Sequence, residues 1–136
     1  MTATATEARS VIVEREIPFP PERIWSALTQ PHLIAEWLMK NDFKPVVGQG
    51  FNLRADWGAV DCKVLAVEPN KTLSYTWAAF GLESVVTWTL TPTSTGTHLR
   101  MEQAGFRPDQ EQAYQGARYG WKQFFANLER VVARAD

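Results

Sequence analysis

The sequence predicts an α+β fold in which a curved antiparallel sheet wraps around one long C-terminal helix. Bulky apolar and polar residues alternate along several short stretches, most clearly over residues 51–57, 73–77 and 86–90. Alternation is typical of strands, because successive strand side chains point to opposite faces. The chain closes with one long segment, residues 109–135, whose apolar residues recur at helical spacing. Since a sheet with one apolar face needs a cover, this helix is expected to pack on it.

Two short helices are expected after a first strand. Residues 10–17 alternate in polarity and predict that strand. Pro20 and Pro21 then open a helix at the position where a missing N–H costs least. Pro31 stops this helix and opens a second one.

The middle of the chain is predicted to consist of strands separated by turn-forming residues. The expected strands cover residues 51–57, 60–67, 73–77, 85–90 and 98–103. Glycine, proline, asparagine and serine gather between them, as turns require. Because strands joined by short turns pair with their neighbours, the sheet is expected to be antiparallel.

One face of the closing helix is predicted to be buried. The apolar residues that share an arc of about 120° on a helical wheel are Tyr114, Ala117, Trp121, Phe124, Phe125, Leu128, Val131 and Val132. Gly116 and Gly120 flank this arc, although glycine costs about 1 kcal/mol against alanine inside a helix. Their position suggests close approach by a strand or a ligand. Alternatively, tertiary packing tolerates them.

Composition and charge narrow the class of protein. Residues 10–135 are expected to form one domain after a flexible tail over residues 1–9. The net charge is −1 with no basic stripe, so no nucleic-acid partner is expected. The single cysteine, Cys62, excludes an intramolecular disulfide and fits a reducing compartment. Without a signal peptide or a long apolar run, a cytoplasmic protein with no membrane span is expected.

The helix-facing side of the sheet supplies the candidate ligand pocket. The predicted pocket residues are Trp37, Phe51, Leu53, Trp57, Tyr75, Trp77, Trp88, Met101, Gln103, Gly120, Trp121 and Phe124. Tyr75 and Gln103 are its polar members, and an apolar pocket uses a few such groups to orient its ligand. Two alternatives remain: the set is an ordinary filled core, or the two polar groups bond to each other or to a buried water.

No catalytic residue, cofactor or metal is predicted. His32 and Glu36 stand four residues apart on a helix, a spacing that can hold a metal, but a third ligand is not evident and His98 is expected on the opposite sheet face. Cys62 has no local His or Asn partner, which indicates a buried small hydrophobe. The nucleophile-elbow, metalloprotease and phosphate-loop motifs are absent from the sequence.

The register of the last strand decides whether a charged pair enters the interior. Leu99 and Met101 are expected to face the helix. A slip of one residue would exchange the two faces and bring Arg100 and Glu102 inward, which would favour an enzyme.

An ordered series of short phrases runs along the chain. It comprises Pro21-Glu-Arg-Ile-Trp25, Ala35-Glu-Trp37-Leu, Val64-Leu-Ala-Val-Glu-Pro69, Leu73-Ser-Tyr-Thr-Trp77, Leu90-Thr-Pro92, Gly96-Thr-His-Leu99, Gly105-Phe106 and Gly120-Trp121. From Ser10 onward this series resembles the family named for the activator of heat-shock-protein-90 ATPase, its small bacterial members especially. That family lies within the START-like, birch-pollen-allergen-like superfamily.

The resemblance implies a helix-grip fold: a seven-stranded antiparallel sheet, two short helices after the first strand, and a long C-terminal helix. It also implies a cavity of the kind that the superfamily uses for apolar molecules such as lipids, polyketides and hormones. The chain departs from the family at Gly48-Gln49-Gly50, where adjacent glycines are common, and near Cys62, where a glycine is common.

Three functions stay open. The leading one is a carrier or sensor that binds a small apolar ligand. The family name suggests a second, a co-chaperone-like module with a chaperone partner in the stress response. The third is a cyclase- or hydratase-like enzyme that uses the same cavity.

Overall fold

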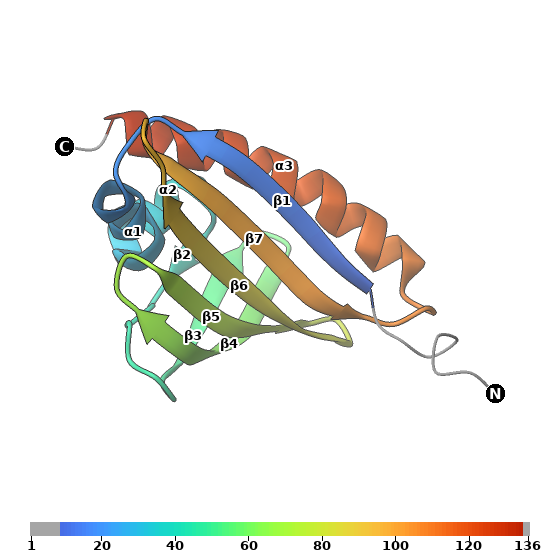
Figure 1. Ribbon diagram of the computed structural model, residues 1–136. Coiled ribbons are helices and arrows are strands. Elements are labelled where there is room, and N and C mark those ends of the chain that lie inside the picture. The colour runs from blue at the N-terminus through green and yellow to red at the C-terminus, as the bar shows by residue number, and fades with distance from the viewer. Residues whose placement is uncertain (1–8, 135–136) are drawn as a thin grey trace.

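The computed structural model, which describes residues 9–134, is a seven-stranded antiparallel sheet wrapped around one long helix (Figure 1). The strands are β1 (Arg9–Ile17), β2 (Lys40–Asn41), β3 (Gly50–Ala55), β4 (Gly58–Glu68), β5 (Thr72–Ala79), β6 (Leu82–Pro92) and β7 (Thr97–Phe106). The helices are α1 (Pro21–Thr29), α2 (Pro31–Trp37) and α3 (Glu111–Arg134). The predicted helix-grip fold is confirmed.

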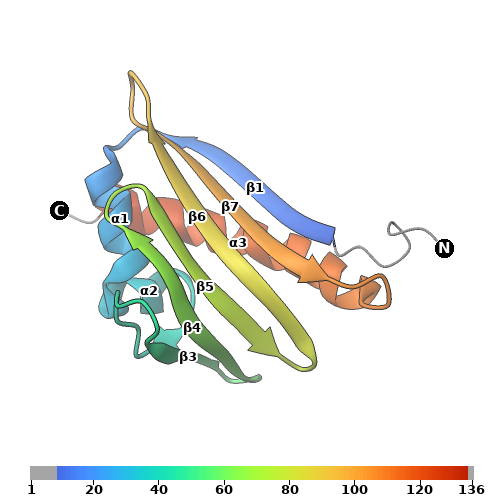
Figure 2. The same ribbon diagram turned by 60° about the horizontal axis from the view of Figure 1, so that its bottom comes forward.

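The strand order brings the beginning and the end of the sheet together. The order is β1-β7-β6-β5-β4-β3-β2, with every neighbouring pair antiparallel. The first strand therefore lies beside the last, and α3 runs along both of them (Figures 1 and 2). The short helices α1 and α2 both contact α3, near its C-terminal end.

Some boundaries differ from those predicted. The strand β2 was missed because two residues are too few to show alternation. The helix α3 begins at Glu111 rather than Asp109, since the Arg107 N–H donates to Gln110 Oε1 at 2.9 Å and closes a turn before the helix. Arg9, predicted to lie in the tail, belongs to β1. The rest of that tail, residues 1–8, and the predicted helical residue 135 lie outside the described residues.

The core centres on Trp88 of β6, which is fully buried. Its ring meets Trp37 and Trp121 edge-on, with centroids 5.6 and 5.7 Å apart, and stacks on Phe125 at 5.5 Å. Aromatic pairs at these separations contribute beyond the area they bury. The α2 helix, the α3 helix and the sheet are thus joined at one point.

The buried residues of α3 all lie from Trp121 onward. The buried residues there are Trp121, Phe125, Leu128, Val131 and Val132. Tyr114, Ala117 and Phe124, predicted to share the buried arc, are only half-buried. The first half of α3 therefore packs less closely on the sheet than the wheel predicts, and this leaves space beneath it.

The predicted register of β7 is confirmed. Leu99 and Met101 are completely buried on the helix-facing side. Arg100 and Glu102 lie on the outer face, where their side chains approach to 3.3 Å. No charged pair enters the interior from this strand.

His98 lies on the outer sheet face, as predicted, between two carboxylates of β1. Its Nε2 lies 2.7 Å from Glu14 Oε1, and its Nδ1 contacts Glu16. Hydrogen bonds to Glu16 and Glu14 raise the pKa of His98 above its ordinary value.

The His98 cluster predicts a pH-dependent stability. Because the folded-state pKa is raised, the stabilisation is fully present below the unfolded value of about 6.5 and is lost as pH rises through the folded value. His98→Gln should therefore flatten the difference in unfolding free energy between about pH 5.5 and about pH 8. Urea titrations at the two pH values measure it, and an unchanged pH dependence would contradict the assignment.

None of the helices in residues 9–134 is long and apolar enough to cross a membrane.

Candidate ligand pocket

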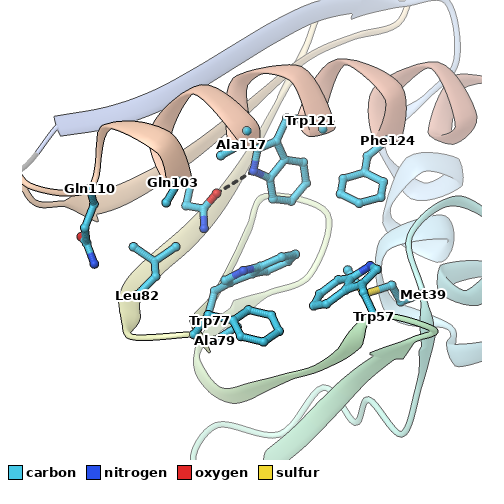
Figure 3. Close-up of a pocket in the computed structure, with 14 residues that line it drawn as sticks. Met39, Trp57, Trp77, Ala79, Leu82, Gln103, Gln110, Ala117, Trp121 and Phe124 are labelled. Carbon is cyan, nitrogen blue, oxygen red and sulfur yellow. Dashed lines mark hydrogen bonds between the residues drawn. The ribbon is translucent and has the colours of Figure 1, made fainter.

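A pocket of about 500 Å³ lies between the first half of α3 and the β5–β6 hairpin (Figure 3). The residues that line it are Met39, Trp57, Trp77, Ala79, Phe80, Leu82, Gln103, Gln110, Ala113, Gly116, Ala117, Gly120, Trp121 and Phe124. None of these described lining residues is charged, and five of them are aromatic. The volume falls within the range of about 300–1,000 Å³ that is usual for small-molecule sites.

The two glycines of α3 keep one wall of this pocket open. A Cβ added at Gly116 would meet no heavy atom of the described chain within 4 Å, and at Gly120 it would meet only the Phe124 ring, at 4.0 Å. The idea that a strand approaches these glycines closely is therefore wrong. Both glycines border the pocket instead.

Aromatic rings form the inner wall and the mouth. Inside, Trp121 of α3 packs against Trp77 at 5.5 Å and against Phe124 at 5.4 Å between centroids. At the mouth, Trp57 and Phe80 lie 5.8 Å apart and are 55% and 81% exposed. The pocket thus opens to solvent beside two large exposed rings.

Phe80 has an unusual backbone conformation. With Gly81 it forms the two-residue loop of the β5–β6 hairpin, and the φ angles are 51° and 82°. Positive φ at both loop positions is typical of type I′ hairpins, which favour Asn, Asp and Gly. A phenylalanine here carries strain, of a kind that gathers at binding sites.

Gln103 is the buried polar group of the pocket. It is 2% exposed. Its Oε1 accepts a hydrogen bond from Trp121 Nε1 at 2.7 Å, drawn in Figure 3, and its Nε2 donates to Ser84 Oγ at 2.9 Å. Ser84 Oγ in turn donates to the Trp77 carbonyl at 2.9 Å.

Tyr75 lies behind the pocket rather than in it. Its hydroxyl oxygen accepts a hydrogen bond from Trp88 Nε1 at 3.0 Å. Burial raises the pKa of Tyr75 well above its ordinary value, so the phenol stays neutral. The alternative in which Tyr75 and Gln103 bond to each other is wrong, since each has other partners.

Half of the predicted pocket residues line the pocket. These are Trp57, Trp77, Gln103, Gly120, Trp121 and Phe124. The others, Trp37, Phe51, Leu53, Tyr75, Trp88 and Met101, are buried core residues outside its lining. They follow the alternative of an ordinary filled core.

Trp57 reaches the mouth by a different route from the one predicted. Alternation predicts it on the inward face of a strand, but β3 ends at Ala55 and Trp57 lies in the turn before β4. The lining residues outside the predicted pocket set are Met39, Ala79, Phe80, Leu82, Gln110, Ala113, Gly116 and Ala117, although the position of Gly116 already suggests approach by a ligand. The dipeptide Phe80-Gly81 between two alternating stretches signals a hairpin tip, but nothing in its spacing indicates that the ring borders a pocket.

The candidate metal ligands do not converge. Among residues 9–134, no three His, Cys, Asp or Glu side chains lie close enough to hold a metal ion. His32 is exposed, and Glu36 pairs with Arg134 of α3.

Cys62 is buried on the helix-facing side of β4. Burial, together with the negative charge of Asp61, raises the pKa of its thiol to about 12. A neutral thiol is a poor nucleophile, and the residue fits the predicted small hydrophobe.

Comparison with protein families and curated proteins gave one result. The model of a family described as "Activator of Hsp90 ATPase homolog 1-like protein" matches residues 18–133. Comparison with the curated proteins gave no match.

Several solved structures are similar to this chain. Protein MLL2253 from Mesorhizobium loti is 67% identical with a TM-score of 0.91, over 94% of this chain and 99% of that one. CalU16 from Micromonospora echinospora is 27% identical with a TM-score of 0.81, over 98% and 82%. DynU16, a protein in the dynemicin biosynthetic locus, is 25% identical with a TM-score of 0.84, over 93% of this chain and 48% of that one.

Proposed function

The chain belongs to the family of Activator of Hsp90 ATPase homolog 1-like proteins, and from this premise we propose that it binds a small, uncharged aromatic molecule. The site is the pocket between α3 and the β5–β6 hairpin. One observation carries the proposal: the lining combines five aromatic rings with a single deeply buried amide, and no described lining residue is charged.

The lining favours an uncharged ligand on energetic grounds. Burying apolar ligand surface contributes about 25 cal/mol per Å², and well-placed ring pairs add about 0.5–1.5 kcal/mol each. A charged ligand would lose its hydration without meeting an opposite charge in the lining. Aromatic and neutral molecules are thus the best match.

The mouth supports the same proposal. Exposed Trp57 and Phe80 present their rings to solvent where a ligand would enter. The strain at Phe80 costs on the order of 1–3 kcal/mol, and a ligand packed beneath its ring would offset part of it. Large exposed apolar groups beside a cavity are typical of binding sites.

The role that fits is carrier or sensor, in the cytoplasm. Acid–base chemistry needs a titratable group within reach of the ligand, and the described lining residues offer none. The presence of DynU16 in a biosynthetic locus supports a role with small molecules.

A titration with fluorene tests the proposal. Saturable quenching of tryptophan emission is expected, with one ligand per chain, because Trp77 and Trp121 line the pocket. Fluorene-9-carboxylate, the charged counterpart, is expected to bind at least about tenfold more weakly. Absence of saturable fluorene binding, or equal binding of the carboxylate, would overturn the proposed function.

A further inference from the structure

We infer that Gln103 makes the pocket selective for ligands that carry a hydrogen-bond acceptor, such as an aromatic ketone, over ligands of the same shape that carry a donor. The inference rests on the proposed function, since it concerns what that pocket prefers. It follows from the direction of a buried chain of hydrogen bonds through Trp121, Gln103, Ser84 and Trp77.

One end of this chain fixes the orientation of the amide. The indole N–H of Trp121 can only donate, and it lies 2.7 Å from the Gln103 side chain. The amide atom that faces it must therefore be the oxygen. The NH₂ group is turned the other way, and Figure 3 shows the nitrogen on the side of the amide that points away from α3.

The other end favours the same direction. The Trp77 carbonyl can only accept, so the single hydroxyl hydrogen of Ser84 is donated to it at 2.9 Å. Ser84 Oγ is then an acceptor for Gln103 Nε2. A reversed amide would leave the Trp121 N–H without an acceptor and would draw the Ser84 hydrogen away from the Trp77 carbonyl, and buried polar groups avoid such losses.

The amide nitrogen has one hydrogen to spare. Gln103 Nε2 carries two hydrogens, and one is donated to Ser84. No residue among 9–134 accepts the second hydrogen, although Gln103 is only 2% exposed and lines the pocket. The pocket thus presents a fixed donor to its contents.

The second amide of the lining has both of its polar atoms engaged with the backbone. Gln110 lies at the rim, where its Nε2 donates to the Gly81 carbonyl and its Oε1 accepts from the Arg107 N–H. A ligand oxygen placed beside Gln103 gains a hydrogen bond. A ligand N–H at the same place meets the amide hydrogen and gains none.

Three tricyclic probes separate these cases. Fluorene, 9-fluorenone and carbazole share one ring framework and differ at a single position, which is a CH₂, a C=O or an N–H group. Each is titrated against the wild-type protein and against Gln103→Met, so that differences in the hydration of the probes cancel. The preference for fluorenone over fluorene is expected to fall about fivefold in Gln103→Met, the worth of one hydrogen bond.

A second variant tests the fixed orientation of the amide. Trp121→Phe keeps Gln103 but removes the donor that holds its oxygen, so the amide can turn over once the Ser84 hydroxyl donates to it instead of to the Trp77 carbonyl. The disadvantage of carbazole relative to fluorene should then shrink about threefold or more, while fluorenone keeps its preference. Ser84→Ala, which leaves the Trp121 bond in place, should preserve discrimination against carbazole.

The outcomes distinguish the inference from its premise. If no probe binds the wild-type protein, the proposed function fails and the inference falls with it. If all three bind but their ratios are the same in the wild type, Gln103→Met and Trp121→Phe, the pocket binds ligands and the role of Gln103 is refuted. If the affinity ratios of the three probes change in the variants as described, the result supports both the proposed function and the role of Gln103.

Discussion

Replacing Phe125 with alanine is expected to lower the free energy of unfolding by about 3–5 kcal/mol, the usual loss for a buried aromatic. Phe125 is 1% exposed and stacks on Trp88 with centroids 5.5 Å apart. It holds α3 to the centre of the sheet, and the guanidinium of Arg15 lies 5.7 Å from its ring centroid. Urea denaturation followed by tryptophan fluorescence measures the loss.

The neighbouring phenylalanine provides a matched control. Phe124 is half-buried and lines the pocket, with its closest ring contact to Trp121. Phe124→Ala should therefore cost only about 1–2 kcal/mol, although the helical wheel alone predicts a core position for both residues. Equal losses for the two variants would mean that the two rings are equally buried, with the buried face of α3 centred between them and turned by about 50°.

The fold could be predicted because the strand and helix patterns of the sequence agree with the requirement that the apolar face of the sheet be covered. Alternation identified the five strands between residues 51 and 103 and the inward positions of Leu99 and Met101, and the α3 segment was the only available cover. Prolines marked the starts of α1 and α2 correctly. The two-residue strand β2 could not be found, because its pairing with β3 is a tertiary contact that leaves no periodicity in the sequence.

The pocket could be predicted only in part, for a different reason. Alternation assigns a side chain to a face, but it does not say whether that face is covered at that point. Trp88 and Trp77 have the same inward orientation, yet Trp88 lies beneath Phe125 while Trp77 borders the pocket. The difference arises from how α3 packs over the sheet, which depends on contacts far apart in the chain.

The mouth shows the same limit. Trp57 and Phe80 come from two separate turns and meet 5.8 Å apart. Each turn is recognisable in the sequence, from Gly58 and Gly81, but their meeting depends on the curvature of the sheet. The periodicity of the sequence does not report the curvature of the sheet.

Replacing Gly120 with leucine is expected to weaken binding of fluorene at least about tenfold while leaving the protein as stable as before or more so. A Cβ at Gly120 meets only the Phe124 ring, at 4.0 Å, so the backbone accepts a side chain there, and Gly120 lines the pocket. The helix gains up to about 1 kcal/mol when a glycine is replaced by a better helix former. The leucine side chain, however, occupies space that the ligand needs.

Two further variants separate the loss of space from a general effect of the substitution. Gly120→Ala brings the same gain in helix propensity with little bulk, so its binding should lie between those of the wild type and Gly120→Leu. Gln123→Leu adds a leucine at an exposed position of α3 that does not line the pocket, and it should bind fluorene as the wild type does. Binding is followed by tryptophan quenching, and stability by urea denaturation of the same samples.

If Gly120→Leu bound fluorene as tightly as the wild type, the ligand would have to lie elsewhere. A side chain that fills space at the wall of the proposed site should lower the affinity, because the ligand would have to give up contacts with Trp121 or Trp77 to make room.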